Sequence, residues 1–203
     1  RNRRIHKMRV VIIGHTAGIG KSLAAHFRKK KWDVVGLSRS NGYDLERDVT
    51  KIVGAATGCD LFINNAYRDK QQLVLFKQLR YKVGKIICMG SISRQYPELI
   101  PTDYVHDKQD LYEAMRLHSL TPSSIPSLHL DLSFIENTDV NFDDPTAFTS
   151  DNHISHKEII SAIDFWLDNP KVKNIEFEWK CTPFVRRELE RINPNLDPSR
   201  IKF

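Results

Sequence analysis

Three glycines that follow an apolar run are the first residues in this chain whose type and spacing indicate a binding function. Gly14, Gly18 and Gly20 come directly after Val10–Ile13 and open a segment with helical periodicity. Glycines there permit a tight turn, a close approach of the backbone to a phosphate, and close helix–strand packing. The helix N-terminus adds unpaired N–H groups and the positive end of its dipole. We therefore predict a nucleotide-phosphate loop, with an unliganded glycine turn or a P-loop as alternatives.

A second pattern places a tyrosine and a lysine one helical turn apart. Tyr104 and Lys108 share one face of a predicted helix because residues i and i+4 are neighbours there. A free tyrosine has a pKa of about 10, which is too high for efficient proton exchange near neutrality. The lysine charge favours the tyrosinate and is expected to lower that pKa. The pair predicts an acid/base site, against the alternative of an ordinary surface Tyr–Lys pair.

Short apolar runs alternate with helix-period segments along the chain, which predicts βαβ units and a mostly parallel sheet. We expect a doubly wound, three-layer α/β/α fold in a single domain over residues 8–203, behind a basic N-terminal extension at 1–7. Ligands bind such sheets at the carboxyl ends of the strands. The predicted strands are Val10–Ile13, Val34–Leu37, Tyr43–Leu45, Leu61–Asn64, Lys85–Met89, Ser127–Leu132 and Val172–Trp179. The predicted helices are Lys21–Lys31, a short helix from Asp48 through Ala56, Asp69–Tyr81, Tyr104–Leu117, His156–Leu167 and Val185–Arg191.

Composition sets the class of protein. The chain has 203 residues, of which 40% are hydrophobic and 28% charged, an ordinary soluble balance. We see neither a signal peptide nor a run long enough to cross a membrane. Three cysteines without metal spacing predict a reducing, cytoplasmic setting and no metal site. Much of the net charge of +6 sits in residues 1–7, which favours a solvated terminus over a nucleic-acid-binding arm.

At this point the sequence resembles the classical short-chain dehydrogenase/reductase family, in a compact and atypical form. The matching segments occur in the family's order: VVIIGHTAGIGKSLA, CDLFINNA, KIICMGS, the Tyr104-x-x-x-Lys108 pair, and Leu132–Ile135 after the sixth strand. The resemblance implies a Rossmann-like oxidoreductase that interconverts a carbonyl and an alcohol. It further implies Ser91 as the residue that holds the substrate oxygen, Tyr104 as general acid/base, and Lys108 as a ligand of the nicotinamide ribose.

The end of the second strand bears on the choice of cofactor. An acid there would bind the ribose 2′-hydroxyl of NAD(H), but the chain has Arg39, whose planar fork suits a 2′-phosphate. NADP(H) is preferred, and NAD(H) stays open. For the adenine side we prefer Asp44-Leu45 over Asp48-Val49, since Asp48 suits a helix cap. The full predicted cofactor set is Gly14, Thr16, Ala17, Gly18, Ile19, Gly20, Ser38, Arg39, Ser40, Asp44, Leu45, Asn65, Ala66, Tyr67, Tyr104, Lys108 and Ile135.

The chain also departs from the family pattern. Tyr67 stands where the family has a glycine after Asn-Asn-Ala, and Ser133-Phe134 replace its Pro-Gly. The family's catalytic asparagine is missing from a shortened helix, where Gln71, Gln72 or a water are the alternatives. A catalytically weak NADP(H)-binding sensor is therefore the second hypothesis. The expected partner is a small carbonyl or alcohol substrate, with no membrane; a homo-oligomer (dimer or tetramer) and a monomer both stay open.

Overall fold

Strand formation in this chain follows its short apolar runs. A computed structural model describes residues 7–98, 100–133, 135 and 154–177, and these contain six strands in one parallel sheet. The strands are β1 (Arg9–Ile13), β2 (Asp33–Leu37), β3 (Leu61–Asn64), β4 (Ile86–Met89), β5 (Ser127–Asp131) and β6 (Asn174–Glu176). Their order across the sheet is β2-β1-β3-β4-β5-β6, with every neighbouring pair parallel.

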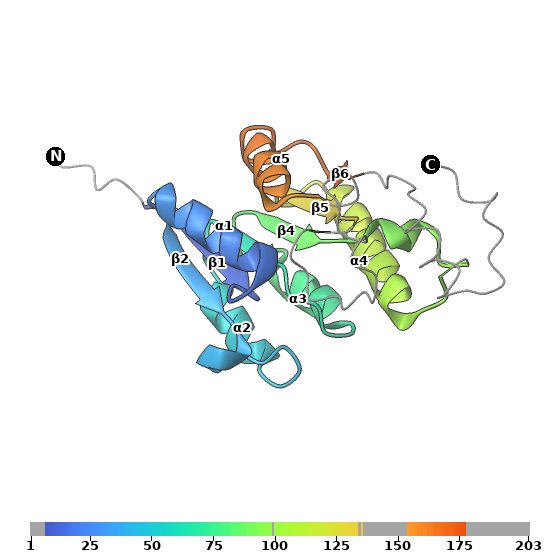
Figure 1. Ribbon diagram of the computed structural model, residues 1–203, viewed down its shortest axis with the longest axis horizontal. Helices are drawn as coiled ribbons and strands as arrows, with labels where there is room; N and C mark the ends of the chain where they lie inside the picture. Colours follow the sequence, from blue (N-terminus) through green and yellow to red (C-terminus); the bar gives the residue numbers. More distant parts are fainter. Residues whose placement is uncertain (1–6, 99, 134, 136–153, 178–203) are drawn as a thin grey trace, which may run out of the picture.

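Helices cover both faces of this sheet, as Figure 1 shows. The described helices are α1 (Gly18–Lys29), α2 (Val49–Ala56), α3 (Gln71–Leu79), α4 (Asp103–Ser119) and α5 (His156–Asp168), with short 3₁₀ turns η1 (Arg39–Asn41) and η2 (Ile92–Gln95). One buried cluster joins the sheet to α1 and α5, and a second joins its other face to α2, α3 and α4. Alternate residues of β1 enter opposite clusters, Val10 and Ile12 the first, Val11 and Ile13 the second. The predicted doubly wound, three-layer α/β fold is confirmed.

One predicted strand is wrong. Residues 43 and 44 are irregular and 45–47 form a turn, so the chain passes from η1 to α2 without adding to the sheet. Local side-chain bonds hold this segment: the Asp44 N–H donates to Asp48 Oδ2 at 2.9 Å, and the Glu46 N–H donates to Asp44 Oδ1 at 2.8 Å. Asp48 precedes α2 as expected, but its carboxylate bonds Asp44 and does not cap the helix.

Other predicted elements keep their type with shifted ends. The glycine loop and α1 follow β1 directly, and α4 begins at Asp103 behind Thr102, whose side chain accepts the Val105 N–H. The last strand is shorter than predicted among the described residues, covering 174–176. The predicted helix Val185–Arg191 and the extension at 1–6 lie outside the described residues.

The topology fixes where a ligand can enter. The sheet order reverses at β1, since the chain moves outward to β2 and then returns to the other side with β3. In open parallel sheets a crevice forms beyond the carboxyl ends of the strands at such a reversal. The glycine loop leaves β1 at this place, and the ends of β3, β4 and β5 lie along the same edge.

Candidate active site

The glycine loop has the geometry of a phosphate cradle. Gly14 has φ +80° and Gly18 φ +49°, conformations that side chains with a Cβ rarely adopt. A Cβ on Gly20 would collide with the carbonyl oxygen of Gly14, so α1 starts close against the end of β1. The N-cap residue of α1, Ala17, provides no side-chain cap, which leaves the N–H groups of the first turn for a ligand.

A cavity of about 890 Å³ opens beside this loop. Eleven of the residues predicted to bind cofactor line it: Gly14, Thr16, Ala17, Ser38, Arg39, Ser40, Asp44, Leu45, Asn65, Ala66 and Tyr67. Four lining residues that the sequence did not indicate are Ile13, Tyr43, Glu46 and Arg68. Gly18, Ile19, Gly20, Tyr104, Lys108 and Ile135 are not among its lining residues. Ile135, one of the predicted ligands, forms an isolated parallel bridge with Ile154.

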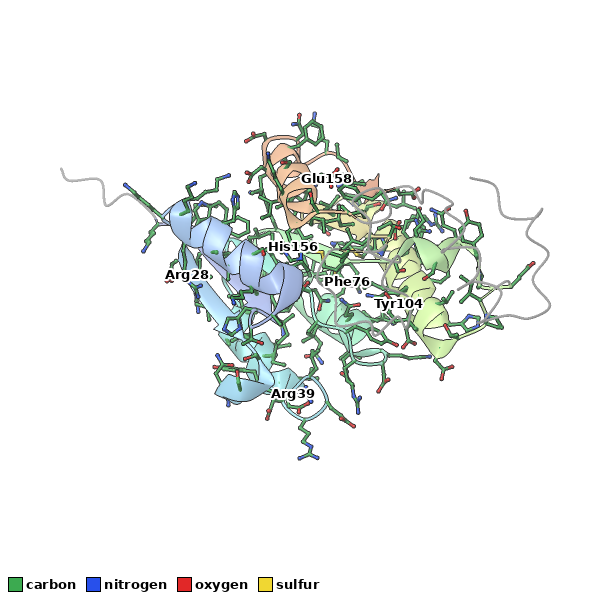
Figure 2. All side chains as sticks on the ribbon, viewed as in Figure 1. Arg28, Arg39, Phe76, Tyr104, His156 and Glu158 are labelled. Atoms are coloured by element: carbon green, nitrogen blue, oxygen red, sulfur yellow. The ribbon has the colours of Figure 1, made fainter. Side chains whose placement is uncertain are left out.

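Arg39 lies on the η1 turn at the end of β2 and is exposed, as Figure 2 shows. Within the described part of the chain, no acidic side chain pairs with its guanidinium. Beside it, the hydroxyls of Ser38 and Ser40 are 2.8 Å apart, and Asn41 Oδ1 accepts the Ser38 N–H at 2.8 Å. The turn is thus held by its own polar groups, while the Arg39 charge stays available at one wall of the cavity.

Ser91, Tyr104 and Lys108 meet where β4 ends and α4 begins. Ser91 caps η2 by accepting the Ser93 N–H, and its side chain lies beside the phenol of Tyr104. Loss of hydration raises the pKa of Tyr104 although 38% of the residue is exposed, and the hydrogen-bonding side chain of Ser91 opposes that rise. The predicted lowering by Lys108 is therefore not found. The Lys108 ammonium lies 5.3 Å from the centre of the Tyr104 ring, and it donates its hydrogen bonds to Gln72 and Met89 instead.

Lys108 is buried, with 3% of its surface exposed. Its Nζ donates to Gln72 Oε1 at 2.6 Å and to the Met89 carbonyl at 2.8 Å. Burial lowers the pKa of Lys108 to about 8, although the nearby Cys88, Asp131 and Asp107 favour its charge. Within the described ranges two of its three N–H groups are engaged, which leaves the third for a ligand.

Of the two glutamines at the start of α3, Gln72 is the one that faces the site. It is 2% exposed, and its Nε2 donates to the Asn64 carbonyl at 3.0 Å, while Asn64 Nδ2 donates to the Gln72 carbonyl at 2.8 Å. A signal for this was present in the sequence, because Gln72 shares helical spacing with the buried Leu75, Phe76 and Leu79. Gln71 is less buried and makes none of these bonds.

Tyr67 packs directly on the predicted Tyr104/Lys108 pair. Its ring meets that of Tyr104 edge-on with centroids 4.8 Å apart, and Lys108 Nζ lies 5.1 Å from its centre. Its hydroxyl donates to Asp107 Oδ2 at 3.0 Å. Burial, together with the Asp107 carboxylate, raises the pKa of Tyr67, so its phenol stays a neutral donor.

No group of three or more His, Cys, Asp or Glu side chains among the described residues is placed to hold a metal ion. The helices of these residues include none with the length and apolar character needed to span a bilayer.

Comparison with known proteins gives a match by structure alone. No family model matches the sequence, and no curated protein matches it. A 3-ketoacyl-(acyl-carrier-protein) reductase from Brucella melitensis, complexed with NADH, aligns with TM-score 0.68 at 16% identity, covering 83% of this chain and 96% of the other. A small-chain dehydrogenase in complex with NADPH aligns with TM-score 0.63 at 15% identity over 84% and 97%. A UDP-N-acetylglucosamine 4-epimerase from Bacillus cereus aligns with TM-score 0.64 at 14% identity over 93% and 81%. The chain therefore has the Rossmann-like fold seen in short-chain dehydrogenases and reductases.

Proposed function

We propose that this chain is an NADP(H)-dependent oxidoreductase that interconverts a carbonyl and an alcohol, with Tyr104 as general acid/base. The observation that carries the proposal is the position of Ser91, Tyr104 and Lys108. They lie on the same edge of the sheet as the glycine-loop cavity, and Tyr67 contacts both, since it lines that cavity and packs on Tyr104. Solved proteins of this fold include complexes with NADH and with NADPH, which supports a nicotinamide cofactor.

The cavity residues fit a dinucleotide. The turn at Gly14 and the uncapped start of α1 suit a pyrophosphate, because they present N–H groups where a Cβ would obstruct its approach. Arg39, which pairs with no acidic side chain of the described residues, and the hydroxyls of Ser38 and Ser40 suit a 2′-phosphate. The third N–H of Lys108 suits a ribose hydroxyl. When bound, the nicotinamide supplies or accepts the hydride.

The chain's own residues supply the proton chemistry. Reduction of a carbonyl requires a proton at the oxygen, and the Tyr104 hydroxyl is the donor available next to Ser91. The Ser91 hydroxyl can donate to the same oxygen and stabilise its developing negative charge. In the oxidative direction Tyr104 accepts the proton. Its raised pKa keeps the phenol protonated near neutral pH, which is the form that reduction requires.

Cofactor choice is tested by titrating NADPH and NADH against the purified protein. Arg39→Ala should weaken NADPH binding by at least about tenfold, the loss of one charge-assisted bond to phosphate, and leave NADH nearly unchanged. Arg28→Ala is the matched control, because Arg28 is an exposed arginine on α1, well apart from Arg39 in Figure 2. Equal weakening of both cofactors by Arg39→Ala would remove the argument for NADP(H).

Catalysis is tested by following NADPH oxidation with a panel of aldehydes and ketones. Tyr104→Phe should abolish turnover and retain NADPH binding, because it removes only the proton donor. The second hypothesis, a weakly catalytic NADP(H)-binding sensor, rests on the short helix α3 and on the absence from it of the family's catalytic asparagine. NADPH binding without any Tyr104-dependent turnover across the panel would favour that sensor.

A further inference from the structure

A buried arginine outside the predicted catalytic set ties the Ser91 turn to the rest of the site. Arg94 lies in η2, three residues after Ser91, and only 6% of its surface is exposed. We propose that Arg94, paired with Asp131, is the positioning residue that holds the Ser91 hydroxyl against Tyr104. The proposal rests on the proposed function for its catalytic meaning, while the geometry it describes is independent of any substrate.

The first anchor of Arg94 is the end of β5. Its Nε donates to Asp131 Oδ1 and Oδ2, each at 3.0 Å, and its Nη2 donates to Asp131 Oδ2. Asp131 is fully buried, so this pair has little screening by solvent. The Arg94 Nη2 also donates to Glu176 Oε1 at 3.0 Å, which extends the anchor to β6. A four-residue 3₁₀ turn is thereby fixed to two strands.

The second anchor is the helix that carries the catalytic pair. The Arg94 guanidinium carbon lies 3.5 Å from the centre of the Tyr112 ring. Tyr104, Lys108 and Tyr112 follow one another at four-residue spacing, so they share one face of α4. Arg94 therefore bridges the Ser91 turn to the same helix face that presents Tyr104 and Lys108. A lysine at position 94 would lack the planar fork and the flat face that make both contacts.

The local bonds of Ser91 do not provide this fixation. Its hydroxyl contacts the Ser93 hydroxyl at 2.8 Å and weakly accepts the Ser93 N–H at 3.4 Å, both within η2 itself. These bonds shape the turn and do not reach α4. The backbone N–H of Ile92 donates to the Leu132 carbonyl at 3.1 Å, which ties the turn to the end of β5 but likewise makes no contact with α4. Among the side chains of η2 that the structure describes, Arg94 makes the contacts to both β5 and α4.

Asp131 also belongs to the electrostatic surroundings of Tyr104. Burial would raise the pKa of Asp131, but hydrogen bonds and charge from His129 and Arg94 hold it below its usual value. The resulting carboxylate raises the pKa of Tyr104. In the described part of the chain, the polar and titratable groups around Tyr104 are Ser91 before η2, Tyr67 from the β3–α3 connection, Lys108 from α4 and Asp131 from β5.

An experiment must separate positioning from the mere stabilising role of a buried ion pair. The double variant Arg94→Met with Asp131→Asn removes both charges, so no unpaired charge stays buried and the fold is expected to survive. Arg116→Met is the matched control, since Arg116 is an exposed arginine of α4 paired with Glu113. Thermal unfolding and NADPH affinity first establish that each variant is folded and holds its cofactor pocket.

The decisive measurement needs no substrate. Tyrosines are replaced by 3-fluorotyrosine, whose phenol titrates at lower pH, and the Tyr104 fluorine signal is identified with Tyr104→Phe. In the otherwise unchanged protein, Ser91→Ala should raise the Tyr104 pKa by about one unit, because the hydrogen bond that favours the phenolate is lost. In the Arg94→Met/Asp131→Asn background, Ser91→Ala should have no further effect. Comparison within each background cancels the change in net charge.

An equal rise in both backgrounds would overturn the proposal, because Ser91 would then reach Tyr104 without Arg94. The kinetic counterpart is a fall in carbonyl-reduction kcat of about 100-fold in the folded double variant, the size expected for a lost oxyanion donor. Wild-type kcat in that variant would likewise overturn it. If the wild-type protein turns over no carbonyl, the proposed function fails, while the fluorine titration still judges the placement of Ser91 by Arg94.

Discussion

Replacing Lys108 with methionine should change how the stability of this protein depends on pH. Lys108 is almost fully buried, and burial lowers its pKa from 10.5 to about 8. Below pH 8 the amine carries its proton in both the folded and the unfolded chain. Above pH 8 the folded chain releases that proton while the unfolded chain keeps it. The unfolded state then binds more protons, so the free energy of unfolding rises with pH.

The size of the effect follows from the two pKa values. Between pH 7 and pH 9, Lys108 should add about 1.3 kcal/mol to the free energy of unfolding. The buried thiols of Cys59 and Cys88 act in the opposite direction near pH 9, because burial raises their pKa to about 11 and about 12. Both thiols remain in the Lys108→Met variant, so their contribution cancels when the variant is compared with the wild type.

Urea unfolding at pH 7, 8 and 9 measures this difference. The free energy of unfolding of the wild type, relative to Lys108→Met, should grow by about 1.3 kcal/mol across the series. Lys77→Met, which alters an exposed lysine of α3, should show no such trend. A wild-type-to-Lys108→Met difference that stays constant from pH 7 to pH 9 would refute the reasoning, because burial would then not outweigh the bonds to Gln72 and Met89.

Two further predictions concern the elements around the cavity. Gly20→Ala places a Cβ against the Gly14 carbonyl, so NADPH affinity should fall at least about tenfold by fluorescence titration; unchanged affinity would contradict the cradle geometry. Ser155→Ala removes the N-cap of α5, whose hydroxyl accepts the Glu158 N–H at 3.2 Å. It should lower the free energy of unfolding by about 1 kcal/mol in urea, and a neutral result would show that the capping box does not stabilise α5.

The sequence was sufficient for the fold because its strands are buried on both faces. Such strands are near-continuous apolar runs, and Val10–Ile13 and Leu61–Asn64 show this clearly. The prediction of a strand at Tyr43–Leu45 was wrong for a physical reason. Tyr43 and Leu45 alternate with a polar residue as in a strand, but the backbone N–H groups of Asp44 and Glu46 donate to nearby carboxylates. These local hydrogen bonds compete with sheet pairing.

Site residues that lie at the ends of strands could be predicted from the sequence. Site residues whose role depends on contacts with side chains far away in the sequence could not. Parallel strands bring their carboxyl ends to one edge, so Gly14, Asn65 and Ser91 were expected along it. The role of Gln72 required the register of α3 against the sheet. Arg94 gave no sign at all, because its partner Asp131 is 37 residues away and a charge in a polar turn is usually solvated.

The burial of Lys108 bears on which of the two functional hypotheses is stronger. A lysine at 3% exposure imposes a desolvation cost, which its two protein hydrogen bonds offset only in part, since its pKa stays lowered. An apolar side chain at this position would make the folded protein more stable. Nucleotide binding alone could account for the groups around the cavity, but Ser91 and Tyr104 are not among the residues that line it. The Ser91 and Tyr104 side chains lie beside each other and close to a buried lysine. This arrangement has a use in proton transfer and none in holding the adenosine half of a cofactor, which favours an oxidoreductase over a sensor.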